Sequence, residues 1–406
     1  MKAIPWSRVA VLATALTLGL PAQAAGPEWF EQALERHPSW LEAQAEQDAA
    51  KARREAASRP RYNPEVGMDV EQGEVLTLSA GVSQTIDRAG LRGALSRSAE
   101  ARLRAAEARL AQRRLDLAHE LLHLIVRNQN THERLRIASE RVDLMHRFVE
   151  ISEKRLASGD LDSSAMALAR LAEAEARMAR AQVAAELSQS EQDLALWFPG
   201  EDLHALPLAL AEVPPLPGPL DEAGLQERLP TLRALAAEVE AARAEVAVRQ
   251  RERRANPTLS LNAGREGEAA LLGLSLSLPW NVRNPYLAEV DAARAESEAM
   301  RARLDQARRD AIVRLRANHA RYRILRQAWE EWQQGGRAGL EGQLEALERL
   351  WSVGELEADA YLLRLKQTLD TREQVVSLRQ DLWLAWLDLR HANGDLLQRL
   401  PRFIRH

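Results

Sequence analysis

The sequence holds one pattern whose residue types and spacing could do chemistry, His119-Glu120-Leu121-Leu122-His123. It matches H-E-x-x-H, in which two histidines one helical turn apart bind zinc and the glutamate between them is the general base of a peptidase. Such a site also needs a third ligand and a cleft that holds the substrate. No histidine follows at the spacing of the metzincin peptidases, and Val126 stands three residues beyond His123.

Other third ligands are poorly placed. Glu140 and Glu150 lie further along the same straight helix and cannot fold back onto the histidines. The equivalent stretch in the second half of the chain, Val313 to Ala317, has no histidine. We therefore predict that the chain is not an enzyme and has no catalytic residue, no cofactor and no metal site. The i, i+4 histidine pair leaves open a surface affinity for metal ions.

Composition indicates which elements carry this pattern. Ala, Leu, Glu and Arg dominate the 406 residues, and aromatic residues make up only 4%. This composition is typical of long helices with narrow apolar seams. The net charge is −4 and no basic patch stands out, so we expect no nucleic acid partner. The absence of cysteine excludes disulfides, so stability must come from packing or oligomerisation.

Residues 1–24 are predicted to be a signal peptide. Lys2 and Arg8 supply positive charge, Val9 to Leu20 form a short apolar core, and Pro21 to Ala24 offer small residues for cleavage. The apolar core is too short for a retained membrane helix. We therefore expect the mature chain to be exported.

Two pairs of short segments alternate between apolar and polar residues, with strands expected at about 64–70 and 75–86, then 257–263 and 269–280. In the returning strands the apolar residues share one face, and Ser, Thr and Gly share the other. The pattern fits a soluble hairpin with one buried face. It also fits membrane strands beside a water-filled lumen, because about 9–11 residues cross a bilayer when tilted.

A long helix is predicted to follow each strand pair. In the first copy Leu103, Leu110, Leu117 and Leu124 recur every seven residues, which indicates a coiled-coil seam. Glycine breaks at Gly159 and Gly354 separate each long helix from a returning helix. We expect the second long helix to run unbroken from about residue 286 to 350. The proline-rich residues 201–224 are expected to cross the helices halfway along their length.

The order strand pair, long helix, glycine turn and returning helix, repeated after a signal peptide, resembles the TolC-type outer-membrane efflux proteins. The strings Gly273 to Asn284 and Gly81 to Asp87 resemble the heavy-metal (CzcC- and CusC-like) branch of this family. The resemblance covers nearly the whole mature chain. It implies a mainly α fold with a small β part, built from tandem repeats at 25–200 and 225–397, followed by a tail at 398–406.

The resemblance also implies an assembly and a function. Three copies would form a homotrimer with a 12-stranded β-barrel in the lipid of the outer membrane and an α-helical tunnel in the periplasm. The chain would be the passive exit duct of a tripartite efflux system, working with a periplasmic adaptor (membrane fusion) protein and an inner-membrane RND pump. Heavy-metal cations are suggested as cargo by the branch resemblance and by acids near the turns.

The periplasmic turns are the candidate tip or gate, with candidate residues Gly159, Asp160, Asp162, Gly354, Glu355, Glu357 and Asp359. Family members often place acids further into the returning helix, where this chain has Ala360 to Leu363. The acids here could attract cations, or they could cap the helices and complement their dipoles. The second turn is the better candidate for gating, because it has an additional residue, a tryptophan and one more acid.

One alternative function belongs to a different class. The chain could be a periplasmic coiled-coil scaffold or an adaptor-like protein without a pore. An adaptor usually has one helical hairpin flanked by β-rich domains, whereas this chain doubles the hairpin. The sequence therefore favours the duct.

Overall fold

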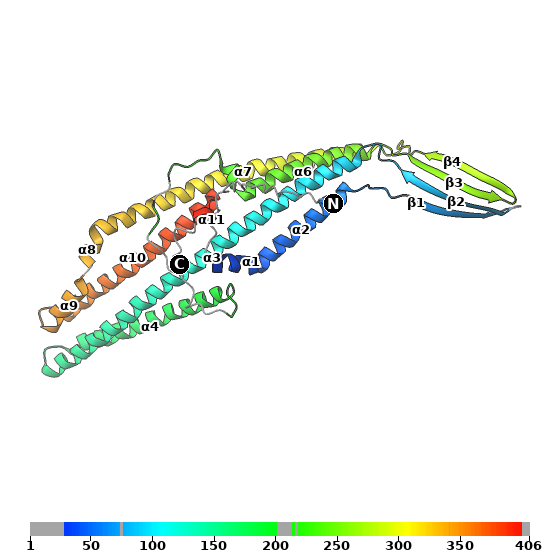
Figure 1. Cartoon of the computed structure of the whole chain (residues 1–406). Coiled ribbons are helices and arrows are strands. Elements are labelled where there is room, and N and C mark those ends of the chain that lie inside the picture. Colours follow the sequence, from blue (N-terminus) through cyan, green and yellow to red (C-terminus); the bar gives the residue numbers. More distant parts are fainter. Residues whose placement is uncertain (1–27, 74–75, 201–212, 216–217, 341, 400–406) are drawn as a thin grey trace, which may run out of the picture.

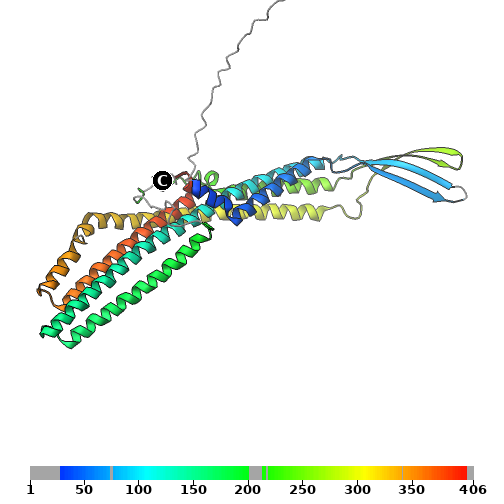
Figure 2. The same cartoon turned by 60° about the horizontal axis from the view of Figure 1, so that its bottom comes forward.

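The computed structural model describes residues 28–73, 76–200, 213–215, 218–340 and 342–399. The expected signal peptide, residues 201–212 and 216–217 of the proline-rich crossing, and residues 400–406 of the C-terminal tail lie outside these residues. The molecule is elongated, with a sheet at one end and two helical turns at the other (Figure 1). Figure 2 shows the same arrangement from a second direction.

The first half contributes helices and one strand pair, and the second half repeats the plan with more breaks. The elements of the first half are α1 (Glu28–Arg36), α2 (Pro38–Ser58), β1 (Glu65–Gln72), β2 (Leu76–Thr85), α3 (Leu91–Ser158) and α4 (Ser163–Ala195). Those of the second half are α5 (Leu225–Arg228), α6 (Pro230–Glu252), β3 (Thr258–Glu266), β4 (Ala269–Ser277), α7 (Leu287–Glu331), the π-helix η2 (Trp332–Gly336), α8 (Arg337–Leu340), α9 (Gln343–Ser352), α10 (Ala358–Asn393) and α11 (Leu396–Arg399).

The two predicted strand pairs form one antiparallel sheet in the order β1-β2-β3-β4. β2 and β3 join the halves of the chain, with Val82 opposite Leu261 and a 2.8 Å hydrogen bond between the hydroxyls of Thr85 and Thr258. Large apolar side chains on one face stay exposed, including Val66 at 78% and Leu272 at 80%. β1 and β4 are edge strands. A soluble hairpin would bury this face, and here the single chain leaves it uncovered.

The first long helix is continuous, as predicted. α3 has no proline, and its single glycine, Gly93, lies in the first turn. Small residues such as Ala94, Ala101 and Ala105 are buried along it, so neighbouring helices can approach closely. α6 packs along the half of α3 near the sheet and α4 along the half near the turn, which together give α3 a split partner.

The prediction of an unbroken second long helix was wrong. α7 ends at Glu331, and η2, α8 and α9 complete the path to the turn. Gly335, Gly336, Gly339 and Gly342 weaken helix here by roughly 1 kcal/mol each relative to alanine. Gly342 has φ +80°, a left-handed conformation that ends the regular helix before α9. The break lies beside Trp332, whose ring occupies the space that a side chain at Gly336 would need.

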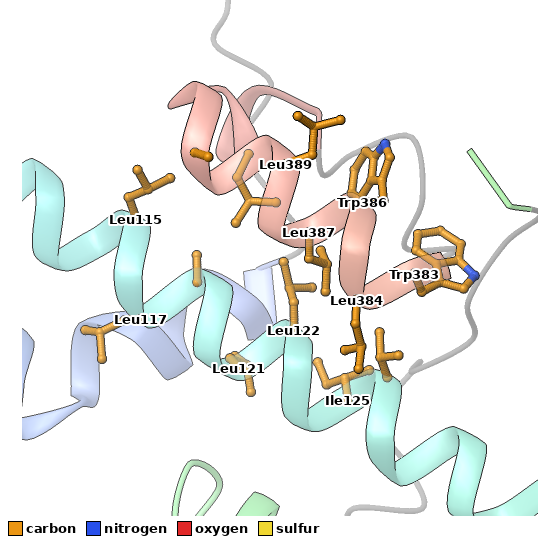
Figure 3. Packing of buried hydrophobic residues seen from close by; sticks show 14 of the residues in the cluster. Leu115, Leu117, Leu121, Leu122, Ile125, Trp383, Leu384, Trp386, Leu387 and Leu389 are labelled. Atoms are coloured by element: carbon orange, nitrogen blue, oxygen red, sulfur yellow. The ribbon is translucent and has the colours of Figure 1, made fainter. Parts of the chain in front are cut away.

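The main core lies midway along the molecule, where α10 crosses α3 (Figure 3). Leu122 and Ile125 of α3 lie beside Leu387 and Leu384 of α10 in this cluster, and each is at most 8% exposed. Burying a side chain of this size contributes roughly 1.5–3 kcal/mol. A second cluster fills the space between the helices near the turns. Among the described helices, none combines the length and the apolar character that a membrane span requires.

Candidate functional site: the paired helical turns

The two turns have the same backbone geometry. Gly159 and Gly354 both have φ +83°. The amides of Gly159 and Asp160 donate to the carbonyls of Leu156 and Arg155 at 3.2 and 2.9 Å. In the second turn the amides of Gly354 and Glu355 donate to Trp351 and Leu350 at 3.2 and 3.0 Å. A left-handed glycine after the helix satisfies the last carbonyls in this way. The two turns are therefore structurally equivalent.

Three aromatic rings hold the second turn against α3. Trp351 and Tyr361 stack with centroids 5.3 Å apart, and Phe148 of α3 lies 5.0 Å from Trp351 and 5.2 Å from Tyr361. Each ring is at most 2% exposed. Burial raises the pKa of the Tyr361 hydroxyl to about 12, so the phenol stays neutral. Tyr361, which stands in the stretch where the family resemblance predicts acids, is thus part of an apolar cluster in this chain.

Arg155 connects the two turns directly, a role that the sequence did not suggest. Its Nη2 donates a hydrogen bond to the carbonyl of Trp351 at 2.6 Å, and its guanidinium carbon lies 3.9 Å from the Trp351 ring centroid. An arginine over an indole face is stabilised by the ring quadrupole. The only hint in the sequence was that the Arg-Leu string occurs twice, at Arg155 and at Arg349. The string does not show that Arg155 of the first turn contacts the second turn.

All five candidate acids are exposed at the turns. The Asp160 carboxylate accepts from the Ser158 hydroxyl at 2.7 Å. Asp162 caps α4, accepting from the amide of Ala165 at 2.7 Å, and this bond holds the pKa of Asp162 below its ordinary value. Asp359 accepts from the amide of Ala360, whereas Glu357 occupies the N-cap of α10 without a side-chain hydrogen bond. The acids therefore combine capping with a surface of exposed negative charge.

The histidines of the H-E-x-x-H pattern lie far from the turns, at the crossing of α3 and α10. A carboxylate from α10 meets them, with Asp388 Oδ1 at 2.9 Å from His119 Nε2 and 3.1 Å from His123 Nε2. Burial alone would raise the pKa of Asp388, but the two histidines hold it well below its usual range. Burial lowers the pKa of His119. The prediction of no metal site weighed third ligands only on the helix that carries the histidines, α3. The third donor atom belongs to Asp388 of α10.

Comparisons with known proteins agree with this architecture. Residues 29–197 match the model of the family described as outer membrane efflux protein. The cobalt-zinc-cadmium resistance protein CzcC of Cupriavidus metallidurans is 28% identical over 314 residues, which cover 73% of this chain and 74% of CzcC.

Solved structures share the fold. The crystal structure of CusC has a TM-score of 0.76 at 18% identity and covers 90% of this chain and 91% of its own. VceC from Vibrio cholerae has a TM-score of 0.72 at 18% identity (90% and 95% covered). MtrE from Neisseria gonorrhoeae has a TM-score of 0.73 at 17% identity (93% and 91% covered). The structures of CusC and MtrE are described as those of channels, and the prediction that the chain is not an enzyme is confirmed. Over residues 29–197 the chain matches the outer membrane efflux protein family, and its fold is that of CusC, VceC and MtrE.

Proposed function

We propose that three copies of this chain form the outer-membrane exit duct of a tripartite efflux system that exports heavy-metal cations. The observation that carries the proposal is the four-stranded sheet at one end of the molecule. Its apolar face is exposed, with Leu272, Leu274 and Leu276 at 70–80%. Such a face is stable in lipid and would be a liability in water.

The two edge strands of this sheet need partner strands, which other copies of the chain could supply. β1 and β4 each have one neighbour, and unpaired strand edges are very costly inside a bilayer. If β1 of one copy pairs with β4 of the next, three copies give a closed barrel with an even number of strands. The helices beneath would then form a tunnel that ends at six structurally equivalent turns.

The turns are the proposed docking surface for the periplasmic adaptor protein, with the inner-membrane RND pump beyond it. Gly159, Asp160, Asp162, Gly354, Glu355, Glu357 and Asp359 are the proposed tip residues. Three copies would present fifteen carboxylates at the mouth, five from each chain. A ring of exposed acids raises the local concentration of cations, and this supports metal ions as the cargo. The similarity to CzcC, a cobalt-zinc-cadmium resistance protein, gives independent support for the same cargo.

Membrane fractionation, native mass measurement and planar-bilayer recording test the duct. We expect trimers in the outer-membrane fraction that conduct ions after reconstitution. A monomer free in the periplasm would overturn the proposal and favour the scaffold alternative.

A separate experiment tests the cargo. Deletion of the gene should raise the sensitivity of cells to cobalt, zinc or cadmium salts, and expression of the wild-type chain should restore resistance. Replacing Glu355, Glu357 and Asp359 by the corresponding amides should restore it only partly. Sensitivity to organic dyes alone, with metal resistance unchanged, would contradict metal cargo and leave the duct intact.

A further inference from the structure

We propose that His119, His123 and Asp388 form a binding site for one divalent first-row transition cation, such as Zn²⁺ or Co²⁺. The ion would bridge α3 and α10 at their crossing, midway between the sheet and the turns. This site goes beyond the proposed export function, because it holds a resident ion in the wall of the molecule and does not depend on what the duct carries.

The three donor atoms already converge. The Nε2 atoms of His119 and His123 lie 2.9 and 3.1 Å from the same oxygen, Asp388 Oδ1, and all three donors lie within 4.8 Å of one another. A tetrahedral zinc ion with bonds of about 2.0–2.1 Å separates its ligand atoms by roughly 3.3 Å. The two nitrogen–oxygen separations therefore differ from this value by only a few tenths of an ångström.

His123 supplies a second observation. Its Nε2 atom is buried, and its 3.1 Å contact with Asp388 Oδ1 lacks the geometry of a regular hydrogen bond. Buried polar atoms without a partner are rare in native structures and call for an explanation such as an ion. An imidazole nitrogen that faces a carboxylate without a regular hydrogen bond is a ready metal ligand, and a cation between it and Asp388 would satisfy both groups.

Neighbouring residues hold the donors in place. Arg321 of α7 lies 3.3 Å from Oδ2 of Asp388 and thereby turns Oδ1 towards the histidines. Asn318 donates to the backbone carbonyl of Asp388 at 3.1 Å. The His391 ring packs 4.4 Å from the His119 ring, and its Nε2 lies 2.7 Å from the Asp116 carboxylate. Contacts of this kind, which orient ligands from behind, are a regular part of metal sites in proteins.

The donor set selects the class of ion. Two imidazoles and one carboxylate suit zinc, cobalt, nickel or copper(II), whereas calcium and magnesium prefer oxygen ligands and copper(I) prefers sulfur. The side chains of the three ligands are 19–24% exposed, which leaves a path from solvent for the ion. Glu120, the base of a peptidase motif, is exposed to solvent. The arrangement therefore serves to bind a cation and link two helices.

Cobalt titration of the full mature trimer, purified without a histidine tag, tests the site. We expect visible absorption bands of tetrahedral Co²⁺ that saturate at one ion per chain and disappear when Zn²⁺ displaces it. His123→Gln and Asp388→Asn should each weaken binding by about 10-fold or more, the range seen when a metal environment loses a partner. His132→Gln is the matched control, because His132 is also a helical histidine beside a carboxylate, 3.7 Å from Glu191. It should bind as wild type does.

Thermal unfolding keeps the test decisive if one variant folds poorly. Zn²⁺ should raise the Tm of wild type and His132→Gln, and should leave Asp388→Asn unchanged. Circular dichroism and native mass measurement establish that each variant is a folded trimer. Equal Co²⁺ affinity in wild type, His123→Gln and Asp388→Asn would overturn the proposal, as would the lack of saturable binding in wild type.

Discussion

The two helical hairpins of this chain end in the same turn but reach it by different routes. α3 runs from the sheet to its turn as one helix, whereas the second path passes through α7, a π-helix, α8 and α9. The first turn gains little apolar packing from the residues before its glycine, because Leu156 and Ala157 are exposed. The second is held by a buried aromatic cluster and by Arg155 of the first. Because its path is broken, we infer that the second hairpin is the one that can move. Its contacts with the first hairpin would then limit the amplitude of that movement.

Removal of the indole at position 351 should have the largest effect. Trp351→Ala would leave a cavity between Phe148 and Tyr361, and buried Trp→Ala changes cost about 3–5 kcal/mol. Native-state hydrogen exchange should show that α9 and the start of α10 open far more often, while α4 is unchanged. Leu156→Ala is the control, because the Leu156 carbonyl accepts from Gly159 as the Trp351 carbonyl accepts from Gly354. Equal exchange in both hairpins would contradict the comparison.

Arg155→Ala tests the link between the turns. The variant loses a charged hydrogen bond and a cation–π contact, which together are worth about 2 kcal/mol. Because the turns are the candidate gate, a weaker link between them should raise the single-channel conductance in planar bilayers. Arg349→Ala, the counterpart in the second turn, should conduct as wild type does, and an equal rise in that variant would show that the link is unimportant.

Two adjacent glycines in the broken arm should respond in opposite directions. A methyl group at Gly335 meets open space, so Gly335→Ala should stabilise the arm by about 0.5–1 kcal/mol. At Gly336 the same methyl would overlap the Trp332 ring, so Gly336→Ala should destabilise it by about 1–2 kcal/mol. Hydrogen exchange across 325–350 measures both changes. Changes of the same sign would show that Trp332 does not set the break.

The two turn glycines offer a finer comparison. Gly159→Ala and Gly354→Ala both force a side chain into the left-handed region, at a cost of about 1–2 kcal/mol. Gly354→Ala has an additional effect, because the new methyl would lie 3.3 Å from Arg155 Nη2, whereas the methyl at position 159 meets open space. Limited proteolysis should therefore cut the second turn faster than the first. Equal cleavage rates would argue against contact between the turns.

Asp162→Ala should have the smallest effect, confined to the first turn of α4. The pKa of Asp162 is lowered in the folded chain, so its contribution is present above the ordinary value of 3.8 and is lost as the pH falls through the lowered one. Amide exchange at Ala165 should be faster in the variant at neutral pH, with the difference vanishing in strong acid. Glu357→Ala should leave α10 unchanged, because Glu357 makes no capping bond.

Much of the fold could be predicted from local patterns. The heptad of leucines between Leu103 and Leu124 predicted α3, and alternation predicted the strands that the structure shows. The break after Glu331 was missed, because a helical pattern can tolerate single glycines and the effect of several glycines near Trp332 depends on how that ring packs. The turn glycines were visible because a left-handed residue after a helix favours glycine strongly.

Contacts between distant segments could not be predicted in this way. Arg155 reaches Trp351 across 196 residues, and His119 meets Asp388 across 269. Periodicity shows that His119 and His123 share a helix face but not which helix lies opposite. The spacing of Asp388 and His391, i and i+3 on one face of α10, was the available clue, and it gains meaning only after the crossing with α3 is known.

The pairing of β2 with β3 has a consequence for the order of folding. Thr85 and Thr258, which are hydrogen-bonded across this pair, are separated by 173 residues, whereas each helical hairpin closes around a turn of a few residues. Loop-closure entropy delays contacts between distant segments, so the helical hairpins can form before the seam of the sheet. The exposed apolar face of the sheet is therefore assembled last, after the helices have brought both strand pairs together. This order of folding shortens the time for which the complete apolar face is exposed to water.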